Sequence, residues 1–425
     1  MRVFGFDADD VRQSVATIAP LADSTSSIAS DAHIDDAAKE RFARAVWTTL
    51  AEPGDGTAGF LTSALGASRS LDALIEGRSA AQIVDELNIH GYVERVDGLV
   101  DDIQKALTRW LPRLDSTSAL TAVRTAAHCG ATILIPGDAS WPDQLNDLDS
   151  HAPLGLWVRG DTARLRSADR SISLVGARAA TGYGEHVTIE AASSLVGRGF
   201  AIVSGAAYGI DGAAHRATLA SNGTTFAFLA GGVDRPYPSG HDSLIGRIID
   251  TGAVLSEVPC GTSPTKWRFL QRNRLIAALS QATVVLEAGW RSGSLNTAGH
   301  AAALGRALGA VPGSVMSAAS AGCHRLIREY GATCVTNADE MAELVQGGLD
   351  DLDRGNGRVP GVANLTPEET RVLDALSTGK GRTVDDIARR SGLPNSVVQA
   401  ALGVLQIYEA ADERSHGWVC VPRKR

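Results

Sequence analysis

The chain has 425 residues, a formal net charge of −8 and a pI near 5.7, which argue against a protein that coats nucleic acid through general basicity. Its 44% hydrophobic and 21% charged residues are typical of packed cores, and the length allows two or three domains. The sequence lacks an apolar run of the roughly 20 residues that cross a bilayer, and it does not begin like a secretory signal, so we expect a cytoplasmic protein without a membrane segment.

The first 130 residues predict a helical domain. Apolar residues recur at helical spacing over residues 37–50, 60–65, 71–75 and 99–111. The run Pro53-Gly54-Asp55-Gly56 follows the first of these helices. It is interpreted either as an ordinary turn between helices or as the turn of a helix-hairpin-helix (SAM-like) domain that grips a DNA backbone.

Residues 131–346 predict an α/β domain. From Ser171 onward, short apolar strands alternate with helices, which is typical of a doubly wound, extended Rossmann-like and mostly parallel sheet covered on both faces. We expect an extra strand or two beside this core. The predicted strands are 172–176, 201–205, 225–230, 253–257, 282–288, 307–311 and 333–336, and the predicted helices are 184–196, 212–220, 244–250, 268–279, 294–304, 323–330 and 338–345.

The remaining residues predict a linker and a small C-terminal domain. Residues 347–362 have the Gly- and Asp-rich composition of a linker. Residues 363–425 then favour a winged helix: Pro367 begins a helix, residues 384–390 and 395–405 flank a turn, and residues 417–421 form a strand of the wing. The second helix has few side chains suited to bases or phosphates, so this domain is interpreted equally well as a partner or dimer interface.

Three glycine- or arginine-marked loops stand where predicted strands lead into helices. They are residues 175–178, residues 204–211, and the pair formed by residues 272–274 with residues 287–294. Loops at the carboxyl ends of parallel strands expose the free N–H groups of the following helices and so favour anions. We therefore expect a ligand that carries phosphates.

Within the first two loops, Arg178 offers a fixed fork of donors to a phosphate, and Ala177 precedes it. Ser204, Gly205, Ala207 and Gly209 leave little side-chain bulk, so a phosphate would approach the backbone closely. The alternative is that these glycines only make a tight turn between strand and helix.

The third region adds cations and polar groups. Ser292, Gly293 and Ser294 are expected to begin a helix beside the phosphate, while Lys266, Arg272, Asn273 and Arg274 extend the positive region along another helix. Arg272 and Arg274 cannot face the same spot, so one of them is a candidate partner for Glu257 or Glu287. Trp267 and Tyr208 are candidates either for base stacking or for simple packing.

Ordered motifs extend through the central domain: Gly176-Ala177-Arg178 with Tyr183-Gly184, Ser204 to Asp211, Gly231-Gly232-Val233-Asp234 with Tyr237-Pro238, Ser256-Glu257, Trp267 with Arg272-Asn273-Arg274 and Leu279-Ser280, Ser292-Gly293-Ser294 with Thr297-Ala298, Val311-Pro312-Gly313, and Gly322-Cys323 with Leu326-Ile327 and Gly331-Ala332. With these motifs the chain resembles the bacterial DprA/Smf family. The resemblance implies a non-enzymatic protein that binds and protects incoming single-stranded DNA. It also implies a homodimer that helps load the recombinase RecA in recombination and natural transformation.

Two positions depart from the family pattern. Leu270 follows Phe269 where the family often has Phe-Pro, and Ser239-Gly240-His241 stands where a basic or asparagine side chain is common. The first change predicts a less rigid loop, and the second removes an expected phosphate contact.

Catalysis is the competing interpretation. The segment from Leu286 to Ser294 loosely resembles the site of phosphoribohydrolases of the "Lonely Guy" type, although their Pro-Gly-Gly-x-Gly-Thr loop is absent. Asp211, Glu257 or Glu287 would then act as the base. We expect no cofactor and no metal, because the histidines are dispersed and the five cysteines have no Cys-x-x-Cys pair. The cysteines, predicted to be reduced, are Cys129, Cys260, Cys323, Cys334 and Cys420.

Overall fold

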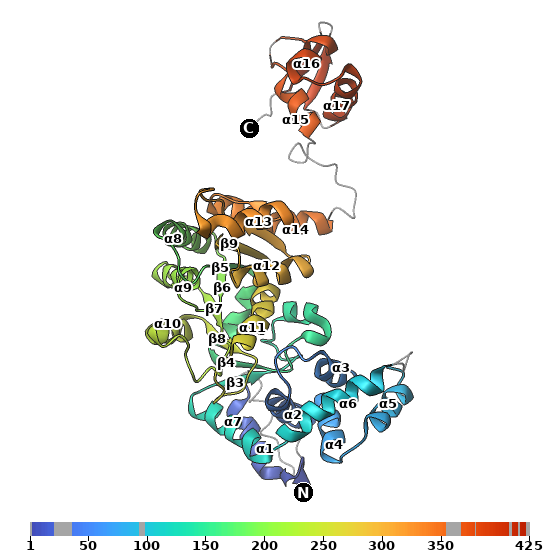
Figure 1. Cartoon of the computed structure of the whole chain (residues 1–425), viewed down its shortest axis with the longest axis vertical. Helices are drawn as coiled ribbons and strands as arrows, with labels where there is room; N and C mark the ends of the chain where they lie inside the picture. The colour runs from blue at the N-terminus through green and yellow to red at the C-terminus, as the bar shows by residue number, and fades with distance from the viewer. Residues whose placement is uncertain are drawn as a thin grey trace. The chain divides into compact units, whose positions relative to one another are not determined.

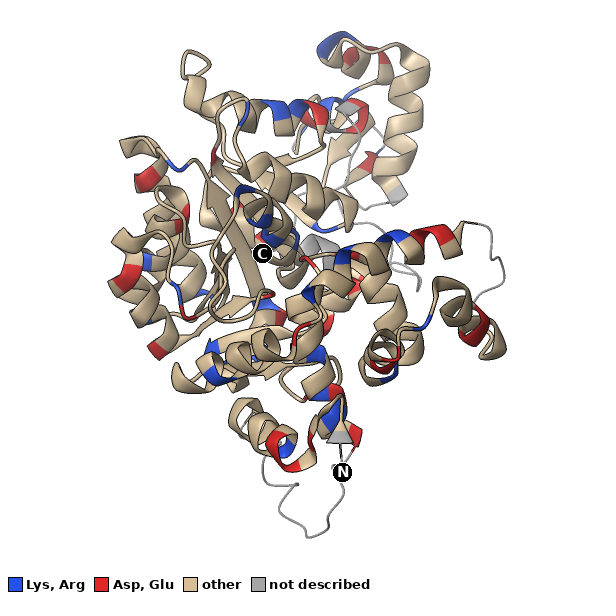
Figure 2. Ribbon diagram, turned by 60° about the horizontal axis from the view of Figure 1, so that its bottom comes forward, with Lys and Arg blue, Asp and Glu red and all other residues tan. Residues whose placement is uncertain are grey.

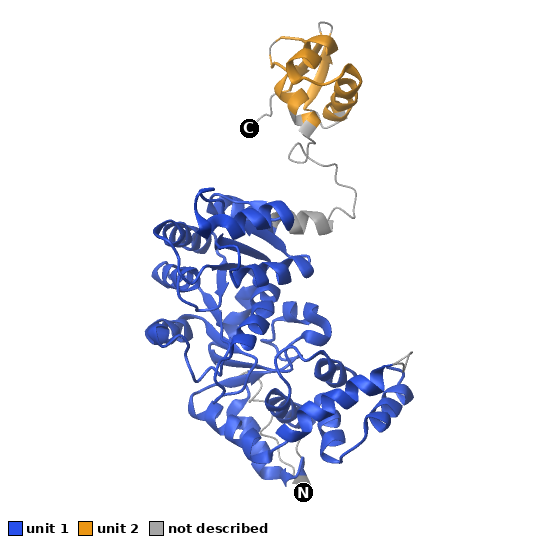
Figure 3. Ribbon diagram, in the orientation of Figure 1, with its two compact units in different colours: residues 1–348 blue, residues 349–425 orange. Residues whose placement is uncertain are grey.

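The computed structural model describes residues 2–20, 36–92, 98–353, 367–378, 380–407, 410–414 and 417–421. The chain forms two compact units, residues 1–348 and residues 349–425 (Figure 3). None of the helices in these described ranges combines the length and the apolarity needed to cross a bilayer.

The larger unit contains a nine-stranded sheet in the order β11-β10-β9-β5-β6-β7-β8-β4-β3 (Figure 1). The seven strands from β11 to β8 are parallel, which confirms the predicted doubly wound, mostly parallel fold. β4 and β3 add an antiparallel edge, and they are the extra strands that the sequence did not place. The bounds are β3 Thr132–Leu134, β4 Leu156–Gly160, β5 Ser171–Gly176, β6 Ala201–Ser204, β7 Thr225–Phe228, β8 Ala253–Ser256, β9 Ala282–Glu287, β10 Ala307–Ala310 and β11 Thr333–Cys334.

Helices cover both faces of this sheet, which explains why its central strands are continuous apolar runs. Every residue of β9 is buried, for example. One face packs against α8, α9, α10 and α14, and the other against α11, α12 and α13 (Figure 1). The bounds are α8 Gly182–Gly197, α9 Ile210–Ala220, α10 Asp242–Thr251, α11 Lys266–Leu279, α12 Ser294–Ala303, α13 Ala321–Glu329 and α14 Ala338–Asp353.

The N-terminal part of the unit is helical, as predicted, after a short hairpin of β1 (Arg2–Val3) and β2 (Phe6–Asp7). Trp47 and Trp110 meet edge to face in its core, with ring centroids 5.1 Å apart. The sequence pattern did not predict α1, α5 and α7. The bounds are α1 Ala8–Ile18, α2 Asp36–Leu50, α3 Gly56–Leu65, α4 Ala67–Ile75, α5 Ala80–Ile89, α6 Leu99–Trp110 and α7 Ser116–His128, and the short 3-10 turns are Leu111–Arg113, Asp143–His151, Thr162–Arg170, Ser239–His241 and Ala318–Ser320.

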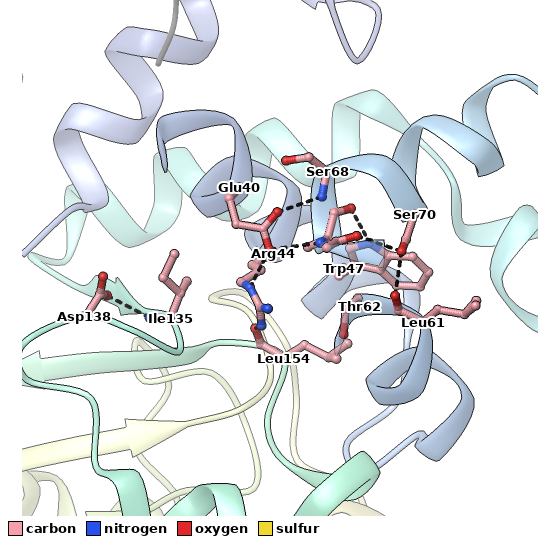
Figure 4. Close-up of polar contacts among 12 residues, drawn as sticks. Glu40, Arg44, Trp47, Leu61, Thr62, Ser68, Ser70, Ile135, Asp138 and Leu154 are labelled. Atoms are coloured by element: carbon pink, nitrogen blue, oxygen red, sulfur yellow. Dashed lines mark hydrogen bonds and ion pairs between the residues drawn. The ribbon is translucent and has the colours of Figure 1, made fainter. Parts of the chain in front are cut away.

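Two arginines on α2, the buried Arg41 and the half-buried Arg44, join the helical layer to the sheet. The guanidinium of Arg41 makes two 2.7 Å bonds to the carboxylate of Asp138, just beyond β3. Arg44 donates to the Leu154 carbonyl at 2.8 Å and to Glu40 at 2.9 Å (Figure 4). Because these charges are paired and hydrogen-bonded, part of the cost of burying them is offset, and the contacts fix the orientation of the two layers.

The turn at residues 53–56 lies against the α/β layer. Asp55 caps α3 by accepting from the amides of Thr57 and Ala58, while the Gly54 amide donates to Glu257 at 3.3 Å. A Cβ at Gly54 would lie 2.9 Å from Gln271 on α11. The turn is therefore a joint between layers, and we do not propose it as a DNA contact.

The smaller unit is a winged helix, as expected from the sequence. α15 (Pro367–Asp374), α16 (Val384–Ser391) and α17 (Asn395–Ile407) pack around one apolar core, and β12 (Ala411–Arg414) pairs antiparallel with β13 (Gly417–Cys420). α14 continues to Asp353, into the first part of the predicted linker. The rest of the predicted linker, residues 354–362, and the first four residues of the predicted winged-helix domain lie outside the described residues.

Candidate nucleic-acid interface

A cavity of about 410 Å³ opens at the carboxyl ends of β5 and β9. These neighbouring strands mark the point where the strand order reverses, since the chain proceeds outward from β5 to β8 and then returns to β9. Such a switch point is the usual ligand site of an open α/β sheet. The predicted site residues that line the cavity are Ala177, Arg178, Ala207, Arg272, Asn273, Ser292, Gly293 and Ser294.

Arg178 follows β5 and forms part of the cavity wall. Its side chain is exposed, and its guanidinium lies 4.9 Å from the ring centroid of Phe269 on α11. A cation over an aromatic face is held in place while its N–H groups in the plane stay available. Phe269 therefore orients a donor fork toward the cavity. The sequence pattern does not indicate this role of Phe269.

Arg272 is a buried cation beside the same cavity, with 6% of its surface exposed. Its Nε and Nη1 have no hydrogen-bond partner among the described residues. Burial lowers its pKa to about 10, against the favourable field of Asp211 and together with repulsion from Arg178. The side chain is therefore still charged at neutral pH. An anion in the cavity would supply the missing partners.

Asp211, the second residue of α9, organises the loop after β6. Its carboxylate accepts from the Gly205 amide at 3.1 Å and also from the amides of Ala207 and Gly176. Burial raises the pKa of Asp211, and Arg272 and these amides oppose the rise. The amides of Gly205 and Ala207 thus bind a carboxylate of the chain itself, which differs from the predicted direct phosphate contact.

Glycine is required at position 205 for a steric reason. A Cβ there would stand 1.4 Å from Nη1 of Arg272, so the glycine makes room for the buried guanidinium. Gly209 has φ +75°, and its Cβ would stand 2.2 Å from the Ala177 carbonyl. The hydroxyl of Ser204 donates to the Leu174 carbonyl at 2.6 Å. These three residues build the loops and lie outside the cavity lining, so the structure does not support the phosphate contacts predicted for them.

The loop after β9 forms the opposite wall. The hydroxyls of Ser292 and Ser294 lie 2.7 Å apart, and α12 begins at Ser294 with no side-chain cap. Asn273 donates to Asn296 at 3.1 Å, which holds α12 against α11. Asn273 thus acts at the base of this wall. Arg291 is an exposed cavity residue within the predicted loop at residues 287–294, and it was not among the residues predicted to contact phosphate.

Arg274 belongs to the joint between layers. It is 3% exposed, makes a 2.6 Å ion pair with Glu257, and donates twice to the His151 carbonyl at 2.9 and 3.0 Å. The alternative that one arginine pairs with Glu257 is confirmed for Arg274. Because its donors bond to Glu257, His151 and Gln271 and it lies outside the cavity lining, the structure does not support the phosphate contact predicted for Arg274.

Lys266, Trp267 and Tyr208 lie outside the cavity lining. Lys266 and Trp267 are exposed in the first turn of α11, with Trp267 at 58%. Tyr208 is half exposed and meets His241 edge to face, at 4.8 Å between ring centroids. All three sit on loops or helix starts at the carboxyl edge of the sheet. Basic and acidic residues are otherwise interspersed over the chain (Figure 2). The attraction of an anion to the cavity would therefore depend on the few cations that line it and not on an extended basic surface.

The candidate bases are held by other groups. Glu287 accepts from the Thr181 amide at 2.8 Å and from the Thr181 hydroxyl at 2.7 Å. Glu257 is paired with Arg274, and Asp211 binds backbone amides. Of these, only Asp211 lines the cavity. Within the described ranges, His, Cys, Asp and Glu side chains do not gather in any group of three that would hold a metal.

Comparison with known proteins gives one consistent family. The family model for DNA recombination-mediator protein A matches residues 132–346, and that for the DprA winged helix domain matches residues 358–411. A DNA processing protein DprA of Mycobacterium tuberculosis is 40% identical over 382 residues, which is 87% of this chain and 91% of that protein. Protein Smf of Escherichia coli is 39% identical over 64% of this chain and 73% of its own length.

Solved structures agree with these sequence matches. The crystal structure of DNA processing protein A from Streptococcus pneumoniae superposes with a TM-score of 0.56 and 27% identity. It covers 71% of this chain and 95% of the pneumococcal chain. The shared part therefore extends beyond the residues matched by the central family model.

Proposed function

The chain belongs to the DNA recombination-mediator protein A (DprA/Smf) family, and from this premise we propose that it binds single-stranded DNA through the cavity at the β5–β9 switch point. The observation that carries the proposal is Arg272, a buried cation whose Nε and Nη1 have no partner among the described residues. A phosphate oxygen would satisfy both the charge and the hydrogen bonds.

Other cavity groups extend this contact. Arg178 and Arg291 place two more guanidinium groups on the wall, and α12 begins there without a side-chain cap at Gly293. The Ser294 amide donates to the Ser292 hydroxyl at 3.4 Å, so the Gly293 amide is the backbone donor that we assign to phosphate. All of these groups recognise phosphate rather than bases, so binding is expected to be independent of sequence.

A single strand fits this recess better than a duplex. A flexible strand can turn one phosphate into a cavity and lay its neighbouring bases on exposed rings, whereas a duplex keeps its bases stacked inside. Trp267 and Tyr208 are the rings available at the same edge of the sheet, and Lys266 adds a cation to the approach.

We further propose the role that the family resemblance implies. The protein acts in the cytoplasm as a homodimer, protects incoming single-stranded DNA and helps load RecA in recombination and natural transformation. It does so without catalysis. The structure supports this last point because Glu257 and Glu287 are engaged in ion pairs or hydrogen bonds outside the cavity.

Fluorescence anisotropy tests the binding. Labelled single-stranded and duplex oligonucleotides are titrated across a salt series, with assay of the same sample for hydrolysis of nucleoside monophosphates. We expect salt-sensitive binding that favours the single strand, and no release of free base. Weak binding with turnover would instead support the phosphoribohydrolase alternative.

A pair of arginine variants locates the contact. Arg178→Ala should lower the slope of log affinity against log salt by about 0.7, the value for one lost phosphate contact to a single strand. Arg166→Ala is the matched control, because Arg166 is an exposed arginine in the 3-10 turn that precedes β5, at the opposite edge of the sheet. Equal effects of the two changes would remove Arg178 from the interface.

A further inference from the structure

Two cysteines from distant parts of the larger unit lie together. Cys129 is the C-cap residue of α7, and Cys260 stands in the loop after β8, with their sulfur atoms 3.9 Å apart. We propose that this pair is an oxidation site, at which the two thiols are converted by a peroxide into a reversible intramolecular disulfide. The bond would join the helical layer to the α/β layer.

The local geometry favours bridge formation. A disulfide has an S–S distance of about 2.05 Å, so the sulfurs must move closer by roughly 2 Å. Cys129 ends its helix, and Gly130 follows with φ +68° and open space around it. This turn allows the Cys129 end to move. Cys260 is only 5% exposed and packs in the apolar cluster shared by α7, α10 and the sheet, so it stays in reach.

The two thiols differ in reactivity. The hydrogen bond with Cys260 and the nearby Arg159 lower the pKa of Cys129, against the effects of partial burial and of Asp234. The Cys129 hydrogen bond and burial raise the pKa of Cys260. The end of α7 also disfavours a thiolate at Cys129. Cys129 is nevertheless the more accessible sulfur, and it is therefore the one that reacts first.

The chemistry requires only the peroxide as oxidant. The Cys129 thiolate attacks one peroxide oxygen, the O–O bond breaks, and Cys129 becomes a sulfenic acid while hydroxide leaves. The Cys260 sulfur then attacks the Cys129 sulfur. The S–O bond breaks, and the Cys260 proton leaves with the hydroxyl as water. Two thiols are thereby oxidised by two electrons and the peroxide is reduced to water.

The position of Cys260 gives the bond a structural consequence. Its loop is tied to the preceding strand connection, because the Gly261 amide donates to Asp234 at 2.9 Å. Five residues after Cys260, Thr265 caps α11, the helix that carries Arg272. A disulfide would thus tether α7 to the segment that leads into α11. Disulfides in reducing compartments are usually transient and redox-sensing, which fits a pair that is reduced at rest.

Peptide mapping of the full chain tests the proposal. After brief treatment with hydrogen peroxide, denaturation and alkylation, we expect the titratable thiols to fall from five to three and to return with dithiothreitol. Mass spectrometry under non-reducing conditions should find the peptides of Cys129 and Cys260 joined. Recovery of both as separate alkylated peptides, while the exposed Cys334 is oxidised, would overturn the proposal.

Variants assign the order of events. In Cys260→Ala, a dimedone-type probe should label Cys129 as sulfenic acid, because the resolving thiol is gone. Cys334→Ser is the matched control and should form the bridge as the natural chain does. A Cys129 that joins two chains, shown by a peroxide-dependent dimer on a non-reducing gel, would contradict the intramolecular bond. The mapping of the natural chain decides the question even where a variant fails to fold.

Discussion

Two buried arginines two residues apart on α11 should respond oppositely to the same substitution. Arg272 has guanidinium nitrogens without partners among the described residues, whereas Arg274 is paired with Glu257 at 2.6 Å. Burial lowers the pKa of Arg272 from 12.5 to about 10. This difference of 2.5 corresponds to about 3 kcal/mol of destabilisation by the charged form, at about 1.36 kcal/mol for each pKa unit.

Arg272→Met keeps an unbranched side chain of similar length and removes that charge. The variant loses a contact with Phe269, at 5.9 Å from the ring centroid, which is worth about 0.5–1 kcal/mol. We therefore expect a net gain of about 2 kcal/mol in the free energy of unfolding without DNA. Arg274→Met should instead lose about 3–5 kcal/mol, because Glu257 remains buried without its partner.

DNA binding should show the reverse ranking. Loss of a charge-assisted hydrogen bond to phosphate is worth about 1.5–3 kcal/mol, so Arg272→Met should weaken single-strand affinity by roughly 10- to 150-fold. Arg274→Met, where folded, should bind close to normally. Urea unfolding followed by tryptophan fluorescence and anisotropy at fixed salt measure the two properties. Destabilisation of Arg272→Met by several kcal/mol would refute the reasoning, since it would mean that Arg272 has a structural partner.

Three further predictions use other contacts. Gly205→Ala should displace the Arg272 guanidinium, which lies 1.4 Å from the new Cβ, and weaken single-strand affinity about as much as Arg272→Met; unchanged affinity in the anisotropy assay would mean that Arg272 does not contact DNA. Asp55→Ala should cost about 2–3 kcal/mol in urea unfolding, because it removes the cap of α3 and the partner of Arg109, whereas Asp55→Asn keeps a cap and should cost less; equal losses would contradict the contribution of the cap. Burial lowers the pKa of His215 from its usual 6.5 to about 3. Between these two pH values the unfolded chain binds a proton at His215 and the folded chain does not, so the free energy of unfolding decreases as the pH falls below 6.5. Between pH 7 and 5 the natural chain should lose about 2 kcal/mol more than His215→Gln, and parallel pH curves would exclude this role.

The sequence predicted the central α/β domain well, because one regular pattern extends through it. Alternation of apolar strands and helices identified β5 to β11 and their helices, since a sheet covered on both faces requires continuous apolar runs. It did not place β3 and β4, because Thr132–Leu134 has only three residues and β4 pairs antiparallel with β8, beyond the repeating unit. Among the described residues of the helical part, α5 was not predicted, although Ser79 and Gln82 form a capping box, which is a sequence signal for the start of a helix.

The sequence predicted the loops that line the candidate cavity, but it did not predict what several individual side chains in them contact. Gly205 and Gly209 were predicted to contact phosphate because glycine is conspicuous in the sequence. In the structure, their lack of a side chain makes room for the Arg272 guanidinium and the Ala177 carbonyl. Which of two arginines faces the cavity depends on where Glu257 lies, and Glu257 precedes them on another element. Phe269 and Arg291 complete the walls through contacts that no spacing rule encodes.

The arrangement around Arg272 explains how a cation can remain unpaired in a folded protein. Asp211 lies near enough to favour its charge, yet the Asp211 carboxylate is occupied by backbone amides and forms no ion pair with it within 4.0 Å in the described residues. If Asp211 were closer, it would form an ion pair with Arg272, and the guanidinium would no longer need a phosphate as its partner. If Asp211 were absent, burial alone would act on Arg272 and would favour loss of its proton. In the proposed interface, the amides of Gly205, Ala207 and Gly176 would contribute to DNA binding indirectly, because they hold the Asp211 carboxylate, whose field favours the charged form of Arg272.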